Sequence, residues 1–349
     1  MSPRLVLLTG PDESVVTGAG RRLRDGGAVE LAYFHEGKSW RRRLGNGRIE
    51  RLGAHGSRTA LVVEDVVEAV EAAAAIPGAE LVVRLPFAVD LAQVLDRIGE
   101  RLPDVVIDSV MVALDSARLE NLLWSKREID FVLVGEHLID ALSCADTCVL
   151  PEERDPRGEH LLSQLAPRAR VHRLGSPGFE TGGYDVDEVI ARCAPGAVTV
   201  PVVAESGPFR TVLVRARLPL HPARLADALP ELAAGSVWSR GRLWIASVPR
   251  RRVVWCGVGP HVAFEDGGVW EADRTDGEAV PASVTLDWDH RFADRGTVLA
   301  FTGDEVDERR IAALLRDCEL TPAEFDTGPP GWSEYHDPLG LPELLPVRA

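Results

Sequence analysis

Short apolar segments alternate with amphipathic segments over the first 200 residues, and this alternation restricts the fold more than any other feature of the sequence. The apolar segments are rich in Val, Leu and Ile, which is typical of strands buried on both faces. They lie at 4–9, 29–34, 59–63, 80–85, 105–110, 147–150 and 169–174. Segments with helical periodicity lie between them, at 64–75, 89–101, 116–125, 135–143 and 158–165. This order predicts an α/β domain over residues 1–200 with a doubly wound, mostly parallel sheet.

The second part of the chain has a different order of elements. A Gly- and Pro-containing loop at 175–183, a helix at 186–193 and an aperiodic linker at 194–206 precede it. Strands are expected at 209–218, 242–248, 253–258 and 296–301, and helices at 221–232 and 306–315. This order predicts an α+β domain over 207–325, with helices on one face of an antiparallel sheet. Residues 326–349 are rich in Pro and Gly and are expected to form an extended tail.

The charge of the chain bounds its partners. The formal net charge is -15, which disfavours a DNA-binding protein because such a protein needs clustered Lys and Arg to displace counterions. The run Arg41–Arg43 could contact RNA, or it could be a solvated face. No apolar stretch approaches the roughly 20 residues of a membrane helix, and residues 1–10 lack the features of a signal peptide. The five cysteines are scattered and odd in number, which favours a reducing cytoplasm over a disulfide framework.

The C-terminal half carries three sequence blocks that occur together in one known family. They are R-L-P-L-H-P-A-R-L at 217–225, W-S-R-G-R-L-W-I-A-S-V-P at 238–249, and L-A-F-T-G-D-E-V-D-E-R-R-I-A-A-L-L-R-D-C-E-L-T at 299–321. In their order and content these blocks resemble the C-terminal domain of the CobW family of P-loop GTPases and metallochaperones. The N-terminal half is similar to the GTPase domain of the same family, but more faintly. The resemblance therefore implies a P-loop type of sheet in the first domain.

Three segments of the N-terminal half carry this fainter resemblance. Leu5–Gly10 takes the place of the strand that enters the Walker A loop. Residues 106–116 resemble the V-V-D-A segment, which puts Asp115 at the aspartate of that motif. Residues 145–150 (A-D-T-C-V-L) resemble the strand that leads into the guanine-reading N-K-x-D motif. The resemblance implies a nucleotide site formed around Gly10, Thr17, Asp115 and Asp155.

The residues of this implied nucleotide site depart from the P-loop pattern G-x-x-x-x-G-K-[ST]. Gly10 is present and Thr17 keeps the hydroxyl that binds magnesium in the family, but Val15 and Val16 replace the second glycine and the lysine. Pro11 also removes a backbone donor. The side chains that would neutralise and wrap a triphosphate are therefore missing.

Two further changes also disfavour nucleotide binding. Asp12 and Glu13 place negative charges where the triphosphate would lie, a repulsion of about 1 kcal/mol per close pair even in water. The guanine-reading motif is replaced by residues 151–154 (P-E-E-R), and Arg154 offers only donors where an aspartate would accept. Asp155 follows one residue later and could take that place in a shifted loop. The sequence favours a pseudo-GTPase.

The metal-binding motif of the family, C-x-C-C, has no counterpart, because no cysteine precedes Cys144. His55 lies in the segment that resembles the approach to that motif and is a candidate ligand or an ordinary loop residue. His290, in the run D-W-D-H at 287–290, is a second candidate, with turn formation as the alternative. Cys144 and Cys148 are expected to diverge as buried apolar groups. Tryptophans gather in the second domain, where they form either the core or a partner-binding face: Trp238, Trp244, Trp255 and Trp270.

Two interpretations follow for function. The first is a non-catalytic CobW-like protein of the cytoplasm, linked to zinc homeostasis, with no resident cofactor. Relatives with decayed P-loops are associated with ribosome remodelling under zinc limitation, so the resemblance implies the ribosome or a ribosome-associated factor as protein partner. The alternative is a residual GTP-binding metallochaperone that uses GTP, magnesium and zinc. A third interpretation is a scaffold that forms a homodimer through its tryptophan-rich domain.

Overall fold

The computed structural model of the protein folds into two compact units, Met1–Cys193 and Ala194–Ala349. The described residues are 4–36, 39–52, 58–74, 80–201, 207–274 and 288–344. The first unit ends seven residues before the predicted boundary at residue 200. Among the described residues, none of the helices is long and apolar enough to cross a membrane.

The first unit is built on an eight-stranded sheet of order β10-β9-β6-β1-β5-β2-β3-β4. The strands are β1 (Arg4–Thr9), β2 (Val29–Glu36), β3 (Ser39–Arg43), β4 (Ile49–Arg51), β5 (Glu80–Arg84), β6 (Val106–Ala113), β9 (Thr147–Leu150) and β10 (Arg170–Arg173). Strands from β10 to β2 pair in parallel, whereas β3 and β4 add an antiparallel edge. This confirms the predicted doubly wound, mostly parallel α/β sheet.

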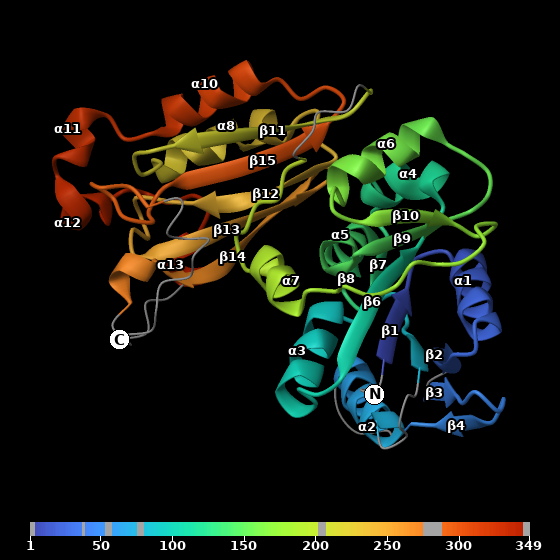
Figure 1. Ribbon diagram of the computed structural model, residues 1–349. Helices are drawn as coiled ribbons and strands as arrows, with labels where there is room; N and C mark the ends of the chain where they lie inside the picture. The colour runs from blue at the N-terminus through green and yellow to red at the C-terminus, as the bar shows by residue number, and fades with distance from the viewer. Residues whose placement is uncertain are drawn as a thin grey trace. The chain divides into compact units, whose positions relative to one another are not determined.

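Helices cover both faces of this sheet (Figure 1). They are α1 (Glu13–Asp25), α2 (Arg58–Ala74), α3 (Leu91–Arg101), α4 (Leu119–Leu123), α5 (Val134–Cys144), α6 (Pro156–Leu165) and α7 (Val186–Cys193), with a 3-10 turn η1 at Ser116–Arg118. Val6 and Leu8 of β1 pack with Val16 of α1 in one buried cluster. Leu5 and Leu7 alternate with them along the strand and are also buried, as a strand covered on both faces requires.

The expected strand at 59–63 is wrong, because this segment forms the beginning of α2. Val62, Val66 and Val70 follow one another at helical spacing and are buried. A short Val-rich run cannot be assigned to a strand or a buried helix from its apolarity alone. The chain continues the run with further helix-period residues, and the helix extends across the predicted boundary at residue 64.

The second unit contains a five-stranded antiparallel sheet of order β11-β15-β12-β13-β14. Its strands are β11 (Arg210–Ala216), β12 (Trp238–Leu243), β13 (Arg251–Val258), β14 (His261–Val269) and β15 (Thr297–Gly303). Helices α8 (Pro222–Ala233) and α10 (Glu308–Cys318) pack together, and α10 also packs on β11 (Figure 1). The predicted α+β architecture is confirmed. The sequence patterns missed β14, and they placed β12 four residues too late.

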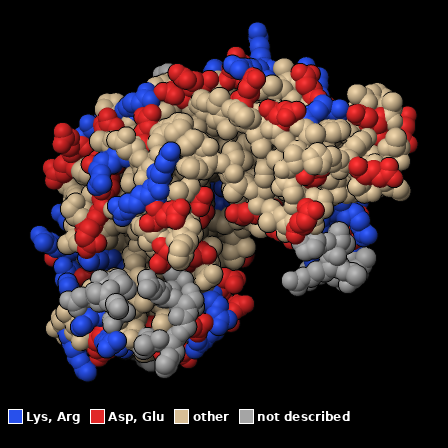
Figure 2. Space-filling view, turned by 180° about the vertical axis from the view of Figure 1, so that it is seen from behind, with Lys and Arg blue, Asp and Glu red and all other residues tan. Residues whose placement is uncertain are grey.

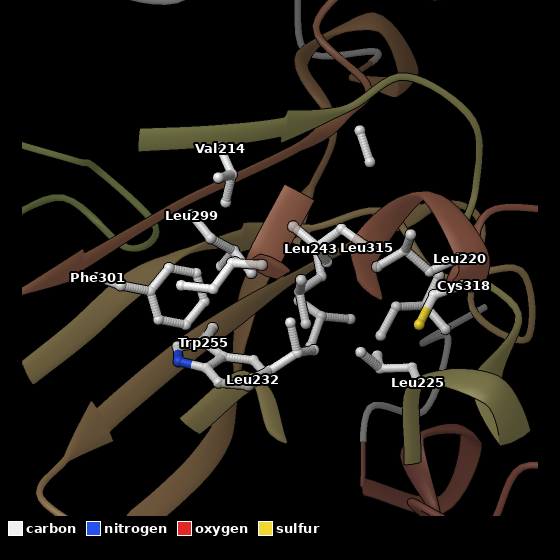
Figure 3. Close-up of a cluster of buried hydrophobic side chains, with 14 of the residues drawn as sticks. Val214, Leu220, Leu225, Leu232, Leu243, Trp255, Leu299, Phe301, Leu315 and Cys318 are labelled. Carbon is white, nitrogen blue, oxygen red and sulfur yellow. The ribbon is translucent and has the colours of Figure 1, made fainter. Parts of the chain in front are cut away.

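An apolar core lies between the sheet and the helices of the second unit, and Figure 3 shows part of it. Trp255 and Phe301 meet at a ring-centroid distance of 6.0 Å, and Leu315 of α10 belongs to the same cluster. The Trp255 indole donates a hydrogen bond of 2.8 Å from Nε1 to Ser239 Oγ, so its polar atom is satisfied inside the core. All four tryptophans that could have formed a partner-binding face are buried: Trp238, Trp244, Trp255 and Trp270.

The predicted extended tail is wrong for the part of it that the structure describes. The tail follows α11 (Pro322–Phe325) and contains the short helices α12 (Gly328–Trp332) and α13 (Leu341–Leu344). Trp332 is buried, with its ring 5.2 Å from that of Phe325 and 6.3 Å from that of Trp244. Pro and Gly in this segment therefore shape tight turns around buried aromatic rings, rather than keeping the chain extended.

Candidate functional site

The loops at the carboxyl ends of β1, β6 and β9 lie at one edge of the parallel sheet, where such sheets bind ligands. These loops carry Asp12, Asp115 and Asp155. Gly10 lets the turn after β1 approach β6 closely, since a Cβ there would lie 1.9 Å from the carbonyl oxygen of Ala113. The residues of the implied nucleotide site are therefore brought to neighbouring loops.

The Asp12 carboxylate is buried and receives its hydrogen bonds from within the chain. The Asp115 backbone amide donates to Asp12 Oδ2 over 2.9 Å, and the Arg118 guanidinium donates to Oδ1 in a short ion pair. Asp12 precedes α1 but makes no side-chain cap for that helix. The N-terminus of a helix after a parallel strand is the usual place for a bound phosphate. In this chain the Asp12 carboxylate lies beside the N-terminus of α1 and is already paired with Arg118 and the Asp115 amide.

The position of the P-loop lysine is part of the hydrophobic core. Val16 and its neighbour Val15 are 2% and 5% exposed, and they pack with Val6 of β1 and Met111 of β6. A lysine there would have to leave an apolar cluster to reach solvent. Valine at position 16, in place of the lysine, therefore packs α1 against the sheet.

The Thr17 hydroxyl lies against an ion pair. Arg84 Nη1 donates to Thr17 Oγ1 over 3.2 Å, and Thr17 Oγ1 in turn donates to Glu13 Oε1 over 3.3 Å. Arg84 Nη2 also bonds Glu13 Oε1 over 2.7 Å, so the three side chains form a closed set. The hydroxyl that would bind magnesium in a P-loop is thus engaged with protein groups.

Asp115 and Asp155 both cap helical turns. Asp115 Oδ1 accepts from the Ala117 amide over 3.1 Å at the start of η1, and Asp155 Oδ2 accepts from the Gly158 amide over 2.9 Å at the start of α6. Each carboxylate thereby satisfies an otherwise unpaired helical donor. Gly158 allows α6 to touch the preceding loop, because a Cβ there would lie 1.9 Å from the Ser116 carbonyl oxygen.

Of the two candidate metal ligands, the described residues include only His290. His55 lies outside the described residues. The His290 side chain is 96% exposed, with Nδ1 at 3.8 Å from Asp289 Oδ1. The Asp289 carboxylate accepts from the backbone amides of Arg291 and Phe292, and these bonds lower its pKa. Over the residues that the structure describes, no group of three or more His, Cys, Asp or Glu side chains is placed to hold a metal ion.

Comparison with known proteins places this architecture in a family. Residues 209–319, within the second unit, match the description Cobalamin synthesis protein cobW C-terminal domain. The zinc chaperone Rv0106 of Mycobacterium tuberculosis is 29% identical in an alignment of length 269 that covers 69% of this chain and 63% of that protein. The second unit is a CobW C-terminal domain, and the chain is CobW-like in sequence.

Two further matches accompany this CobW-like assignment. The zinc-regulated GTPase metalloprotein activator 1 of Dictyostelium discoideum is 28% identical in an alignment of length 217 that covers 56% of this chain and 45% of that protein. The crystal structure of the Zn(II)-bound YjiA GTPase from E. coli aligns with 92% of this chain and 100% of its own, at 14% identity and a TM-score of 0.38. The CobW-like chain matches less than two thirds of the length of the curated relatives.

Two arginines complete the site of this CobW-like protein and were missed by the sequence analysis. Arg118 pairs with Asp12 across 106 residues of sequence, and Arg84 pairs with Glu13 across 71 residues. Arg84 has a recognisable signal, since it is a charged residue that directly follows the buried apolar run Leu81–Val83 of β5. Arg118 is the last residue of the short turn η1 and has no such signal.

The basic run of β3 also forms pairs within the unit. Arg42 bonds Glu50 Oε2 over 2.9 Å and both carboxylate oxygens of Asp65 over 2.9 Å, and Arg43 lies over the ring of Phe34. Acidic and basic side chains are interspersed over the face of the molecule shown in Figure 2. The Arg42 charge is thus shared with two carboxylates, which weakens its attraction for a phosphate backbone.

A small hairpin after α4 exposes an aromatic side chain. Strands β7 (Glu128–Ile129) and β8 (Val132–Leu133) are joined by Asp130 and Phe131 alone. Both connecting residues have positive φ, 52° and 71°, as type I′ hairpin turns require. Phe131 is 96% exposed. A bulky residue in this backbone region is strained, so the tip combines strain with an exposed ring.

Proposed function

We propose that this CobW-like protein acts in zinc homeostasis by binding a protein partner, and that the turn after β1 does not hydrolyse GTP. The observation that carries the proposal is the buried Asp12 carboxylate, which takes the Arg118 guanidinium and the Asp115 amide as its partners. A polyanion bound at the start of α1 would lie close to the negative charge of this carboxylate or would have to displace it. Arg118 and Arg84, which lie beside this turn, are already paired with Asp12 and Glu13.

Electrostatics supports the same conclusion. A triphosphate beside Asp12 and Glu13 would meet a repulsion of about 1 kcal/mol per close charge pair in water, and more where solvent is excluded. In a working P-loop, lysine and backbone amides offset such charge. Here Val16 is buried at the lysine position and Pro11 offers no amide proton. We therefore expect no stable complex with GTP and magnesium.

The link to zinc is supported by the names of the relatives, which are a zinc chaperone and a zinc-regulated GTPase metalloprotein activator. The partner is proposed to be the ribosome or a ribosome-associated protein. The net charge of -15 favours contact with a protein surface over contact with bare RNA. The exposed ring of Phe131 supports a contact with an apolar pocket on that partner.

The nucleotide part of the proposal is tested by isothermal titration of the full chain with GTP and magnesium. We expect no saturable heat under conditions in which a working P-loop GTPase binds in the micromolar range. Saturable micromolar binding would reverse the proposal in favour of the alternative, a residual GTP-binding metallochaperone. The Thr17 hydroxyl, which that alternative retains, offers a matched control: Thr17→Ala should weaken such binding if Thr17 holds magnesium.

The partner part is tested separately, by affinity capture with the tagged full chain from zinc-starved and zinc-replete cells. Enrichment of ribosomal or ribosome-associated proteins in the zinc-starved sample is the expected result. Equal recovery from both samples, or recovery of neither class, would contradict it. Because the assay does not depend on nucleotide, the two parts of the proposal can fail independently.

A further inference from the structure

Helix α7 closes the first unit and brings two cysteines together. Cys144 is the last residue of α5, and Cys193 is the last residue of α7. The two helices pack against each other, as Figure 1 also shows. The two Sγ atoms are 3.6 Å apart, although the residues are separated by 49 positions in sequence. The two thiols are therefore in direct contact.

This contact is held by polar bonds at the end of α5. Arg192, next to Cys193, donates from Nε to the Ser143 carbonyl oxygen over 2.6 Å and from Nη2 to the Ala145 carbonyl oxygen over 2.8 Å. The Tyr184 hydroxyl donates to the Cys144 carbonyl oxygen over 2.8 Å. These bonds satisfy carbonyls that a helix end leaves without partners. They fix the ends of the two helices on both sides of the thiol pair.

The two thiols differ in access. Cys144 is buried, whereas Cys193 is partly exposed. A reagent can thus reach the sulfur of Cys193 first, and Cys144 lies behind it as the resolving group. Cys148 is fully buried on β9 and is a natural comparison for an inaccessible thiol.

We propose that Cys144 and Cys193 form an oxidisable modification site, which closes into a disulfide on reaction with a low-molecular-weight disulfide such as glutathione disulfide. The Cys193 thiolate attacks one sulfur of glutathione disulfide, which forms a mixed disulfide and releases one glutathione thiolate. The Cys144 thiolate then attacks the Cys193 sulfur and releases the second. The two thiol protons end on the two glutathione molecules, so two protein thiols are oxidised and one glutathione disulfide is reduced.

Geometry allows the bond with little movement. A disulfide needs its sulfurs at about 2.05 Å, so the pair must close by roughly 1.5 Å, which side-chain rotation and a small helix shift supply. The contact with Cys193 and burial both raise the pKa of the Cys144 thiol. Little of the Cys144 thiol is ionised at neutral pH, so the second step is slow there and a higher pH speeds it. The product joins the last helix of the first unit covalently to α5.

The experiment is oxidation of the full chain with glutathione disulfide at pH 8.5, followed by intact mass and peptide mapping without reduction. We expect the loss of two hydrogen atoms and a cross-linked peptide pair that contains Cys144 and Cys193. Closing a long loop should also raise the melting temperature of the oxidised protein by roughly 5 °C or more, reversibly with reductant. A map with stable glutathione adducts at Cys193 and no cross-link would overturn the proposal.

Three serine variants test this assignment. Cys193→Ser should abolish the cross-link and the shift in melting temperature, while Cys256→Ser, in the second unit, should leave both unchanged. Cys144→Ser should convert the product into a glutathione adduct on Cys193, since the resolving thiol is gone. A cross-link that persists in Cys193→Ser would assign the oxidation to other cysteines and contradict the proposal.

Discussion

At the scale of single residues, the buried Asp12 carboxylate joins the turn after β1 to the loop after β6. We predict that Asp12→Ala destabilises the protein by about 1–3 kcal/mol, because the Asp115 amide loses its buried acceptor and Arg118 loses its ion pair. Asp12→Asn should cost less, since its amide oxygen can still accept. Urea unfolding measures both variants. Equal stability of Asp12→Ala and the parent would show that the carboxylate has no structural role.

Glu324 gives a pH dependence that also belongs to one residue. The hydrogen bonds from Arg224, followed by those from Thr321, lower the pKa of Glu324 from 4.5 to about 2. A carboxyl whose pKa is lower in the folded state stabilises the fold above its unfolded pKa, and this contribution is lost as the pH falls. The loss therefore lies between about pH 4.5 and pH 2.

The matching experiment compares urea unfolding of the parent and Glu324→Gln at pH 6 and pH 2.5. The parent should lose more stability than the variant between these two pH values, because glutamine cannot titrate. Parallel losses would show that the Arg224 pair does not persist in solution. The capping role of the side chain is partly kept by glutamine, so the folded state remains available for comparison.

Residue chemistry could be predicted from sequence where partners are local. Asp90 lies at the start of the helical segment predicted at 89–101, and its carboxylate accepts from the Ala92 and Gln93 amides, two and three residues on. Arg118 could not be placed, because its partner lies 106 residues away and spacing carries no signal over that distance. The losses at positions 15 and 16 were visible in the sequence, whereas the internal ion pairs at the site were not.

At the scale of elements, the hairpin tip at Asp130 and Phe131 combines strain with exposure. We predict that Phe131→Gly raises the free energy of unfolding by about 0.5–1 kcal/mol. Glycine removes the cost of the left-handed backbone conformation, and this gain exceeds the conformational entropy that glycine loses on folding. The same change should reduce capture of the partner, because the ring is lost. Asp130→Asn keeps the ring and suits the turn, so it should retain capture.

The measurements are urea unfolding and the affinity capture described above. Higher stability of Phe131→Gly with undiminished capture would show that the Phe131 ring does not contact the partner, although its backbone is strained. Lower stability would mean that the ring packs on the hairpin in solution.

Element types followed from sequence where the apolar period was clear, and failed where it was not. Strands of the parallel sheet such as β1 and β9 were predicted because they are mostly continuous apolar runs. The beginning of α2 and the strand β14 were missed, the first because a Val-rich run suits either state, and the second because it is short of apolar residues and lies at a sheet edge. Edge strands bury only part of their surface, and their sequence pattern is correspondingly weak.

At the scale of the whole molecule, a ligand that binds only the folded state raises the free energy of unfolding. A ligand present at 100 times its Kd stabilises the folded state by about 2.7 kcal/mol, whatever its site. For a unit of 193 residues this corresponds to a rise in melting temperature of roughly 5–10 °C. We predict no such rise with GTP and magnesium at millimolar concentration.

This last prediction separates the whole-chain interpretations more sharply than activity does, because a slow GTPase and an inactive one both give little phosphate. A pseudo-GTPase melts at one temperature with and without GTP, and Asp12→Ala melts at a lower temperature in both conditions. A residual metallochaperone melts higher with GTP, and Thr17→Ala reduces that shift. Zinc should be omitted from the first series and added in a second, since a cation bound by scattered histidines of the unfolded chain would lower the measured shift. A rise in melting temperature that appears only when GTP and zinc are both present would show that the two ligands bind cooperatively. It would contradict the proposal that the turn after β1 cannot bind GTP.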